Sequence, residues 1–124
     1  MAYFITKKAS KWAQSNDCTD PILVSAIHEM ERGLVGNALG SCLYKKRVAI
    51  PGTGKSGGWR IIIATKLQEH WFVIHGFAKN VQENIDDEFL GVLRQTSKAL
   101  LSFSPEDISC AMSQGLIRKL SENF

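Results

Sequence analysis

The spacing of apolar residues predicts four helices. The clearest one begins at Asp20-Pro21, because an aspartate caps free N–H groups and a proline fits the first helical turn. Apolar side chains then recur every three or four residues as far as Gly33, which is suited to end a helix. The other helices are expected from Thr6 to about Gln14, from the acidic residues 86–88 to about Leu101, and from Ser104-Pro105 to about Gln114.

Three strands are expected in the middle of the chain, at residues 44–50, 59–66 and 71–78. The first alternates imperfectly, so that Lys45 and Arg47 share one face. The third is apolar on both faces, as is typical of a central strand. Residues 35–41 are expected to form a loop. The pattern predicts an α+β fold, with a small antiparallel sheet of three adjacent strands and the helices packed on one side.

Length and composition indicate a single domain over residues 1–124. A chain of 124 residues has room for one core, and 44% hydrophobic with 22% charged residues is ordinary for a globular protein. No apolar run approaches the roughly 20 residues needed to span a bilayer. The first residues lack the apolar run of a secretory signal. We therefore expect a cytoplasmic protein that does not contact membranes.

The sequence gives no sign of a metal site or a cofactor. The three cysteines are far apart and form no Cys-x-x-Cys pair, and the three histidines lack metal-ligand spacing. Residues 49–56 fit a loose phosphate-loop pattern, which requires a helix to follow. Here Gly57-Gly58 and a β-favouring run follow instead, so we reject a nucleotide hydrolase.

Positive charge is concentrated in the middle of the chain. Residues 43–80 carry seven basic and one acidic side chain, a net charge of +6, whereas residues 1–42 are neutral and residues 81–124 carry −3. Such a local field attracts polyanions even when the whole protein is only mildly basic. If the strands pair as hairpins, four cations converge on one exposed face suited to phosphates, namely Lys45, Arg47, Arg60 and Lys79. The alternative is that these side chains merely solvate strands and loops.

The motifs of this basic region form a specific combination. They are Lys45-Lys46-Arg47, the segment from Gly54 to Arg60, and Gly76-Phe77-Ala78-Lys79-Asn80 followed by Asn84-Ile85. The combination resembles the RelE/HigB-type toxins of bacterial toxin–antitoxin pairs, in particular a subfamily with a Lys-Ser-Gly-Gly-aromatic-Arg signature. The resemblance covers nearly the whole chain and implies a compact RelE-like fold. It also implies a metal-free, ribosome-associated mRNA endonuclease, in which the ribose 2′-OH attacks the adjacent phosphate.

The resemblance assigns a role to each matching position. Lys45 is the candidate base, and Arg47 and Arg60 stabilise the charge of the pentacoordinate phosphorane. Lys79 is a phosphate clamp or a proton donor. Further RNA contacts are expected from Lys46, Lys55, Lys66 and Asn80. The expected partners are mRNA, the ribosome and a cognate antitoxin with a helix-turn-helix domain.

Two positions depart from the family pattern. Val81 to Asp87 contain no tyrosine, whereas some RelE enzymes have one there. His75 stands where relatives commonly have an aromatic residue, and we interpret it as a core histidine rather than an acid–base group. These departures leave two alternatives open. One is a non-catalytic inhibitory toxin that acts on a protein such as a topoisomerase, and the other is an inactive binding module.

Overall fold

The computed structural model describes residues 2–52, 58–79 and 85–121, which form six strands and four helices. The strands are β1 (Tyr3–Thr6), β2 (Asn37–Gly40), β3 (Leu43–Val48), β4 (Trp59–Thr65), β5 (Trp71–Ala78) and β6 (Ile117–Lys119). The helices are α1 (Lys7–Ser15), α2 (Asp20–Glu31), α3 (Asp87–Leu101) and α4 (Pro105–Ser113). The predicted α+β class is confirmed.

The strands form one sheet in the order β2-β3-β4-β5-β1-β6. All neighbouring strands are antiparallel except β1 and β5, which are parallel. The three predicted strands, β3, β4 and β5, form the centre of this sheet, but the prediction that the sheet has only three strands was wrong. Strand β2 lies within the expected loop at residues 35–41, where Gly36 has a φ of +76° and lies so close to Lys45 that a Cβ would clash with its carbonyl oxygen.

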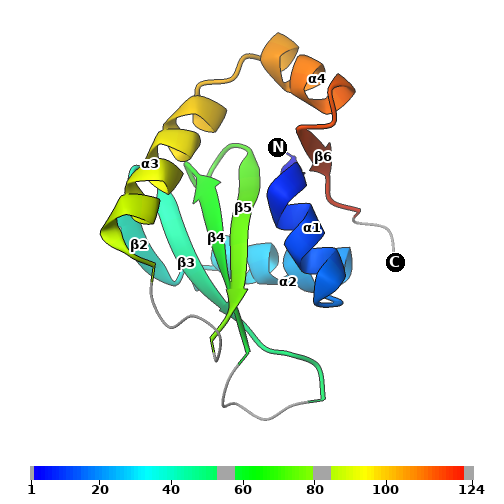
Figure 1. Cartoon of the computed structure of the whole chain (residues 1–124), viewed down its shortest axis with the longest axis vertical. Helices are drawn as coiled ribbons and strands as arrows, with labels where there is room; N and C mark the ends of the chain where they lie inside the picture. Colours follow the sequence, from blue (N-terminus) through cyan, green and yellow to red (C-terminus); the bar gives the residue numbers. More distant parts are fainter. Residues whose placement is uncertain (1, 53–57, 80–84, 122–124) are drawn as a thin grey trace.

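Helices cover both faces of the sheet, rather than one face as predicted (Figure 1). Helices α1 and α2 pack against one face, where Ile61 and Ile63 of β4 are fully buried. Helices α3 and α4 pack against the other face, where Ile62 and Ala64 are buried. Because successive strand residues point to opposite faces, the unbroken apolar run of β4 requires cover on both sides. We refer to these two faces as the α1/α2 face and the α3/α4 face.

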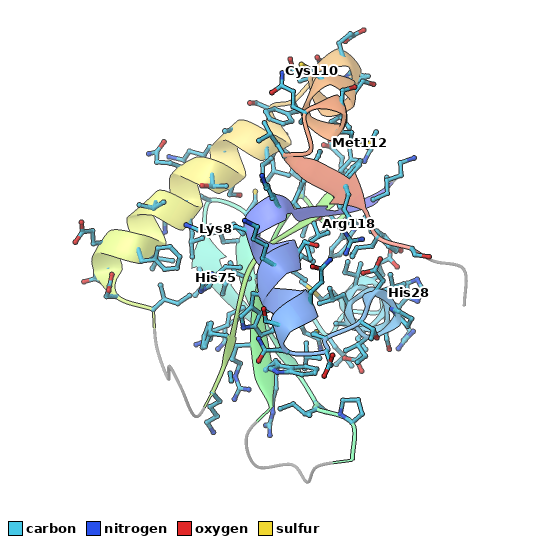
Figure 2. All side chains as sticks on the ribbon, turned by 45° about the vertical axis from the view of Figure 1, so that its right-hand side comes forward. Lys8, His28, His75, Cys110, Met112 and Arg118 are labelled. Atoms are coloured by element: carbon cyan, nitrogen blue, oxygen red, sulfur yellow. The ribbon has the colours of Figure 1, made fainter. Side chains whose placement is uncertain are left out.

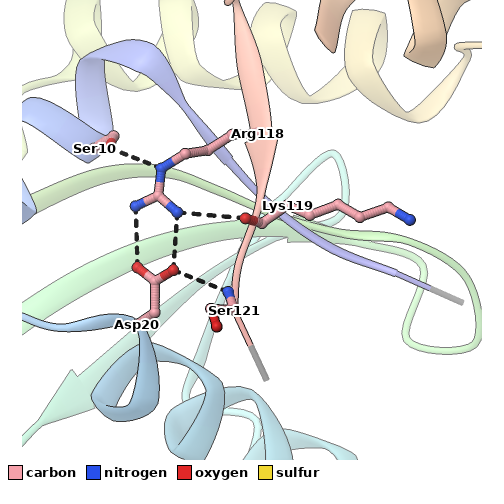
Figure 3. Close-up of polar contacts among 5 residues, drawn as sticks. All are labelled: Ser10, Asp20, Arg118, Lys119 and Ser121. Carbon is pink, nitrogen blue, oxygen red and sulfur yellow. Dashed lines mark hydrogen bonds and ion pairs between the residues drawn. The ribbon is translucent and has the colours of Figure 1, made fainter. Parts of the chain in front are cut away.

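Most predicted helix starts are confirmed by their caps. The side chains of Thr6, Asp86 and Ser104 accept hydrogen bonds from the backbone N–H groups of Ala9, Phe89 and Asp107. Asp20 is the exception, because α2 is preceded by Thr19 and Asp20 lies inside the helix. The Asp20 carboxylate is held by Arg118, whose guanidinium donates to it at 2.8 and 3.0 Å (Figure 3).

Candidate functional site

Strand pairing brings three of the predicted catalytic residues onto one face. Arg47 of β3 lies directly opposite Arg60 of β4, and Lys45 precedes Arg47 by two residues. Paired residues and residues two apart point to the same side of a sheet. Arg60 is two residues from Ile62 in β4 and therefore points to the same side. Because Ile62 packs beneath α3, this side is the α3/α4 face. The strands extend beyond the first turn of α3, so the arginine end of the face is not covered by the helix (Figure 1).

The two guanidinium groups affect each other. Burial, and to a smaller extent the positive charge of Arg47, lower the pKa of Arg60 from its ordinary value. Arg60 is half-buried and donates to the carbonyl oxygen of Trp59 at 3.3 Å, while Arg47 is exposed. Like charges directly opposite each other destabilise a sheet. An anion bound between them would relieve this repulsion, and a guanidinium can hold two phosphate oxygens at once.

Lys45 and Lys79 lie at two borders of the arginine pair. Lys45 is half-buried and lines a small cavity of about 120 Å³ with Leu39, Ile85 and Leu90, at the start of α3. Lys79 is exposed and follows the last residue of β5. Its backbone N–H donates to the carbonyl oxygen of Gly58 at 3.1 Å, which fixes it at the same end of the sheet as Arg60. We call the surface made by Lys45, Arg47, Arg60 and Lys79 the basic face.

Two of the other predicted RNA-binding residues, Lys46 and Lys66, do not join the basic face. Lys46 points to the α1/α2 face, where it is only 8% exposed and its Nζ lies 3.0 Å from the Oε1 of Glu29. Lys66 follows the far end of β4, beside Cys42 and Lys98. The predicted contacts of Lys55 and Asn80 lie outside the described residues.

His75 lies on the same face as Lys45. Both residues pair with Ile62, one from each neighbouring strand, which places their Cα atoms about 10 Å apart across two strand spacings. The pairing shifts register at Ile62/Ile63, so that Ile74 is an extra residue and the bulge turns His75 toward α3. The His75 ring packs edge-on against Phe89, with ring centroids 4.8 Å apart. Our interpretation as an ordinary core residue therefore missed its position beside the basic face.

The surroundings of His75 favour the neutral form of its imidazole. Burial, followed by the charge of Lys8, lowers the pKa of His75 below its ordinary value of 6.5. Its Nε2 is buried, and it has no hydrogen-bond partner among the described residues. Figure 2 shows Lys8 and His75 close together at the border between α1 and β5. A buried nitrogen without a partner is uncommon in folded proteins, and a catalytic role is one of its known explanations.

The other histidines have structural contacts. His70 Nδ1 accepts a hydrogen bond from the backbone N–H of Ala2 at 3.2 Å, and the His28 ring packs edge-on against Tyr3. Within the described ranges, no group of three or more His, Cys, Asp or Glu side chains is arranged to hold a metal ion. Residues 59–65 form a strand, so the loose phosphate-loop pattern is not followed by the helix that its function requires. No helix in the described part of the chain could cross a membrane.

Comparison with known proteins gives one family match. The sequence model described as the RelE toxin of the RelE/RelB toxin–antitoxin system matches residues 1–120. The match covers all ten helices and strands described above. No curated protein sequence matches the chain.

Proposed function

Because the chain belongs to the RelE toxin family and is the toxin of a toxin–antitoxin pair, we propose that it is an endoribonuclease that cleaves mRNA on the ribosome without a metal ion. The observation that carries this proposal is the direct pairing of Arg47 and Arg60 at the end of the sheet that α3 does not cover, with Lys45 on the same side. RNA offers phosphate groups at regular spacing, which such a cluster of cations would bind.

The proposed reaction is an attack of the ribose 2′-OH on the neighbouring phosphate. Lys45, as the proposed base, takes the proton of the hydroxyl, and the new P–O bond forms a pentacoordinate phosphorane. Arg47 and Arg60 hold its equatorial oxygens, where negative charge accumulates. Cleavage of the bond to the 5′-oxygen leaves a cyclic phosphate, and Lys79 clamps the phosphate or returns a proton to the leaving oxygen.

The function is tested by mapping cut sites in a translation system. Wild-type protein and an Arg32→Ala control, changed at an exposed arginine beyond the basic face, should produce new mRNA 5′ ends at discrete positions. Arg60→Ala protein should produce none. Growth arrest by wild-type protein without any new 5′ ends would contradict the endonuclease and favour a non-catalytic toxin that acts on a protein target.

RNA binding by the basic face should depend strongly on salt. With about four phosphate contacts, log affinity for single-stranded RNA should fall with log salt at a slope of about −3. The measurement is a titration of labelled RNA at several salt concentrations. If the RNA is cut, the Arg60→Ala variant separates binding from cleavage, and its slope should be about −2 because one contact is lost. A flat salt response would contradict the proposed role of the basic face.

The cognate partner is a RelB-type antitoxin. We propose that it carries a helix-turn-helix domain and that an acidic segment of it covers the basic face, because the charges that recruit RNA also recruit an acidic peptide. Bound antitoxin should then protect Lys45 and Lys79 from acylation, while the exposed Lys98 of α3 stays reactive. Full reactivity of Lys45 and Lys79 in the complex would show that the antitoxin grips another surface.

A further inference from the structure

Helix α1 presents three lysines that its own stability does not favour. Lys7, Lys8 and Lys11 are all exposed, and α1 contains no acidic residue. Cations near the start of a helix oppose its dipole, and like charges four residues apart, such as Lys7 and Lys11, repel each other. We call this surface the α1 lysine face.

The α1 lysine face begins at the edge of the basic face. Trp12 of α1 packs against Gly76 of β5, so closely that a Cβ at Gly76 would clash with the indole ring. This contact fixes the helix beside the half of β5 that carries His75. Lys8 is near enough to His75 for its charge to affect the imidazole, as the adjacent side chains in Figure 2 illustrate. A strand of RNA that leaves the basic face past His75 therefore meets Lys8 first.

On its other side, the α1 lysine face borders a groove. A cavity of about 350 Å³ lies between α1 and the segment that joins α4 to β6, and its lining includes Lys7, Lys11, Gln14 and Arg118. Asp20, the carboxylate nearest to Arg118, is already neutralised by it (Figure 3). The groove thus offers cations and hydrogen-bond donors without an unpaired carboxylate in its lining.

The opposite exit from the basic face has the opposite charge. Past Lys45 lies the start of α3, where Asp86, Asp87 and Glu88 are all exposed. These carboxylates would repel a phosphate backbone, whereas the lysines beyond His75 would attract it. The charges therefore favour one direction for a bound strand.

Building on the proposed function, we propose that the RNA strand in the active site continues past His75 and along α1, with its phosphates bound by Lys8, Lys11 and Lys7. The chain then holds a single-stranded RNA through two surfaces that meet at the edge of β5. The basic face acts on the cleaved phosphate, and the α1 lysine face binds the flanking nucleotides through their backbone, without reading the bases.

The test compares a Lys8→Gln/Lys11→Gln double variant with an Arg32→Gln/Lys98→Gln control, which removes two exposed cations elsewhere. Binding is measured by fluorescence anisotropy with single-stranded RNAs of about 4 and about 16 nucleotides, the range of known single-strand site sizes. Each protein also carries Arg60→Ala if the RNA is cut during the measurement. Thermal unfolding of each variant checks that the fold is retained.

The double lysine variant should bind the short RNA as the control does. With the long RNA, its salt slope should be shallower than that of the control by about 1.4, since each lost phosphate contact removes about 0.7. Equal binding of the long RNA by the double lysine variant and the control would overturn the proposed path. So would a loss of affinity in the double lysine variant that is the same for the short and the long RNA. A defect seen only with intact ribosomes would also overturn it and assign these lysines to ribosomal RNA. Failure of the proposed function gives a different result from failure of the path. The unmodified protein would then show no salt-dependent binding, even to the short RNA.

Discussion

Arg47 and Arg60 are direct partners in an antiparallel strand pair, so two guanidinium groups leave the same face of the sheet side by side. Nothing in the fold requires this arrangement, because like-charged pairs at opposed positions reduce the stability of a sheet. Its value is that a doubly charged phosphorane can be bound by both groups at once.

The first prediction concerns this arginine pair. Arg47→Gln and Arg60→Gln should each lower the cleavage rate about 10²- to 10³-fold, the usual effect of removing one preorganised donor from a charged transition state. The double variant should lose less than the product of the two single effects, because both groups hold the same phosphate. Single-turnover cleavage rates measure this coupling. Strictly multiplicative losses would mean that the two arginines act on different phosphates.

The second prediction concerns the pH dependence of stability through His75. Folding lowers the pKa of His75, so the unfolded chain binds the proton more tightly, and stability should fall as the pH drops below 6.5. His75→Phe should remove this dependence and raise stability at pH 7 by about 1 kcal/mol, because it replaces a buried nitrogen without a described partner. Denaturant unfolding at several pH values provides the measurement. An unchanged pH profile would show that other groups cause it.

The third prediction concerns the ion pair between Asp20 of α2 and Arg118 of β6. Hydrogen bonds from Arg118, opposed by burial and assisted by the N–H of Ser121, keep the pKa of Asp20 below its ordinary value of 3.8. A double-mutant cycle of Asp20→Asn and Arg118→Gln should give a coupling energy of about 1 kcal/mol at pH 7, since the pair is partly exposed. The coupling should be complete above pH 3.8 and decline below it as Asp20 becomes protonated. Coupling that persists in acid would contradict this account.

The fourth prediction concerns the packing of α1 against the sheet. Gly76→Ala would place a methyl group inside the ring of Trp12, so it should destabilise the protein by about 1–3 kcal/mol. Combining it with Trp12→Leu should recover part of this loss, whereas Gly91→Ala, where a Cβ meets nothing, should be tolerated. Chemical denaturation measures all three. If Gly76→Ala is as mild as Gly91→Ala, α1 does not pack here as described.

Local contacts explain which parts of the fold were predictable from the sequence. The caps at Thr6, Asp86 and Ser104 bind N–H groups three residues away, so their signals lie within one short window. The shared face of Lys45 and Arg47 follows from strand alternation in the same way. That alternation already places Lys46 on the opposite face, where it pairs with Glu29.

Long-range contacts explain what the sequence did not reveal. Strands β1, β2 and β6 are three or four residues long, too short to show a period, and their pairing partners are distant or irregular. The partner of Asp20 is Arg118, which no local pattern indicates. The position of His75 depends on the bulge at Ile74, which reverses the expected alternation of β5. The pairing of Arg47 with Arg60 follows only from the register of β3 against β4, which the sequence pattern does not specify.

Strand β1 sets the order in which this fold can be completed. It pairs with Trp71–Val73 on one side and with Ile117–Lys119 on the other, so both contacts close very long loops, whereas β3, β4 and β5 are joined as neighbours. Contacts between distant residues form slowly because the loop entropy is lost first. During synthesis, β1 therefore keeps one open edge until the last strand has left the ribosome. The strands of the basic face, β3, β4 and β5, can pair long before that. In a nascent chain, the cations of the basic face can therefore be positioned before β6 completes the sheet.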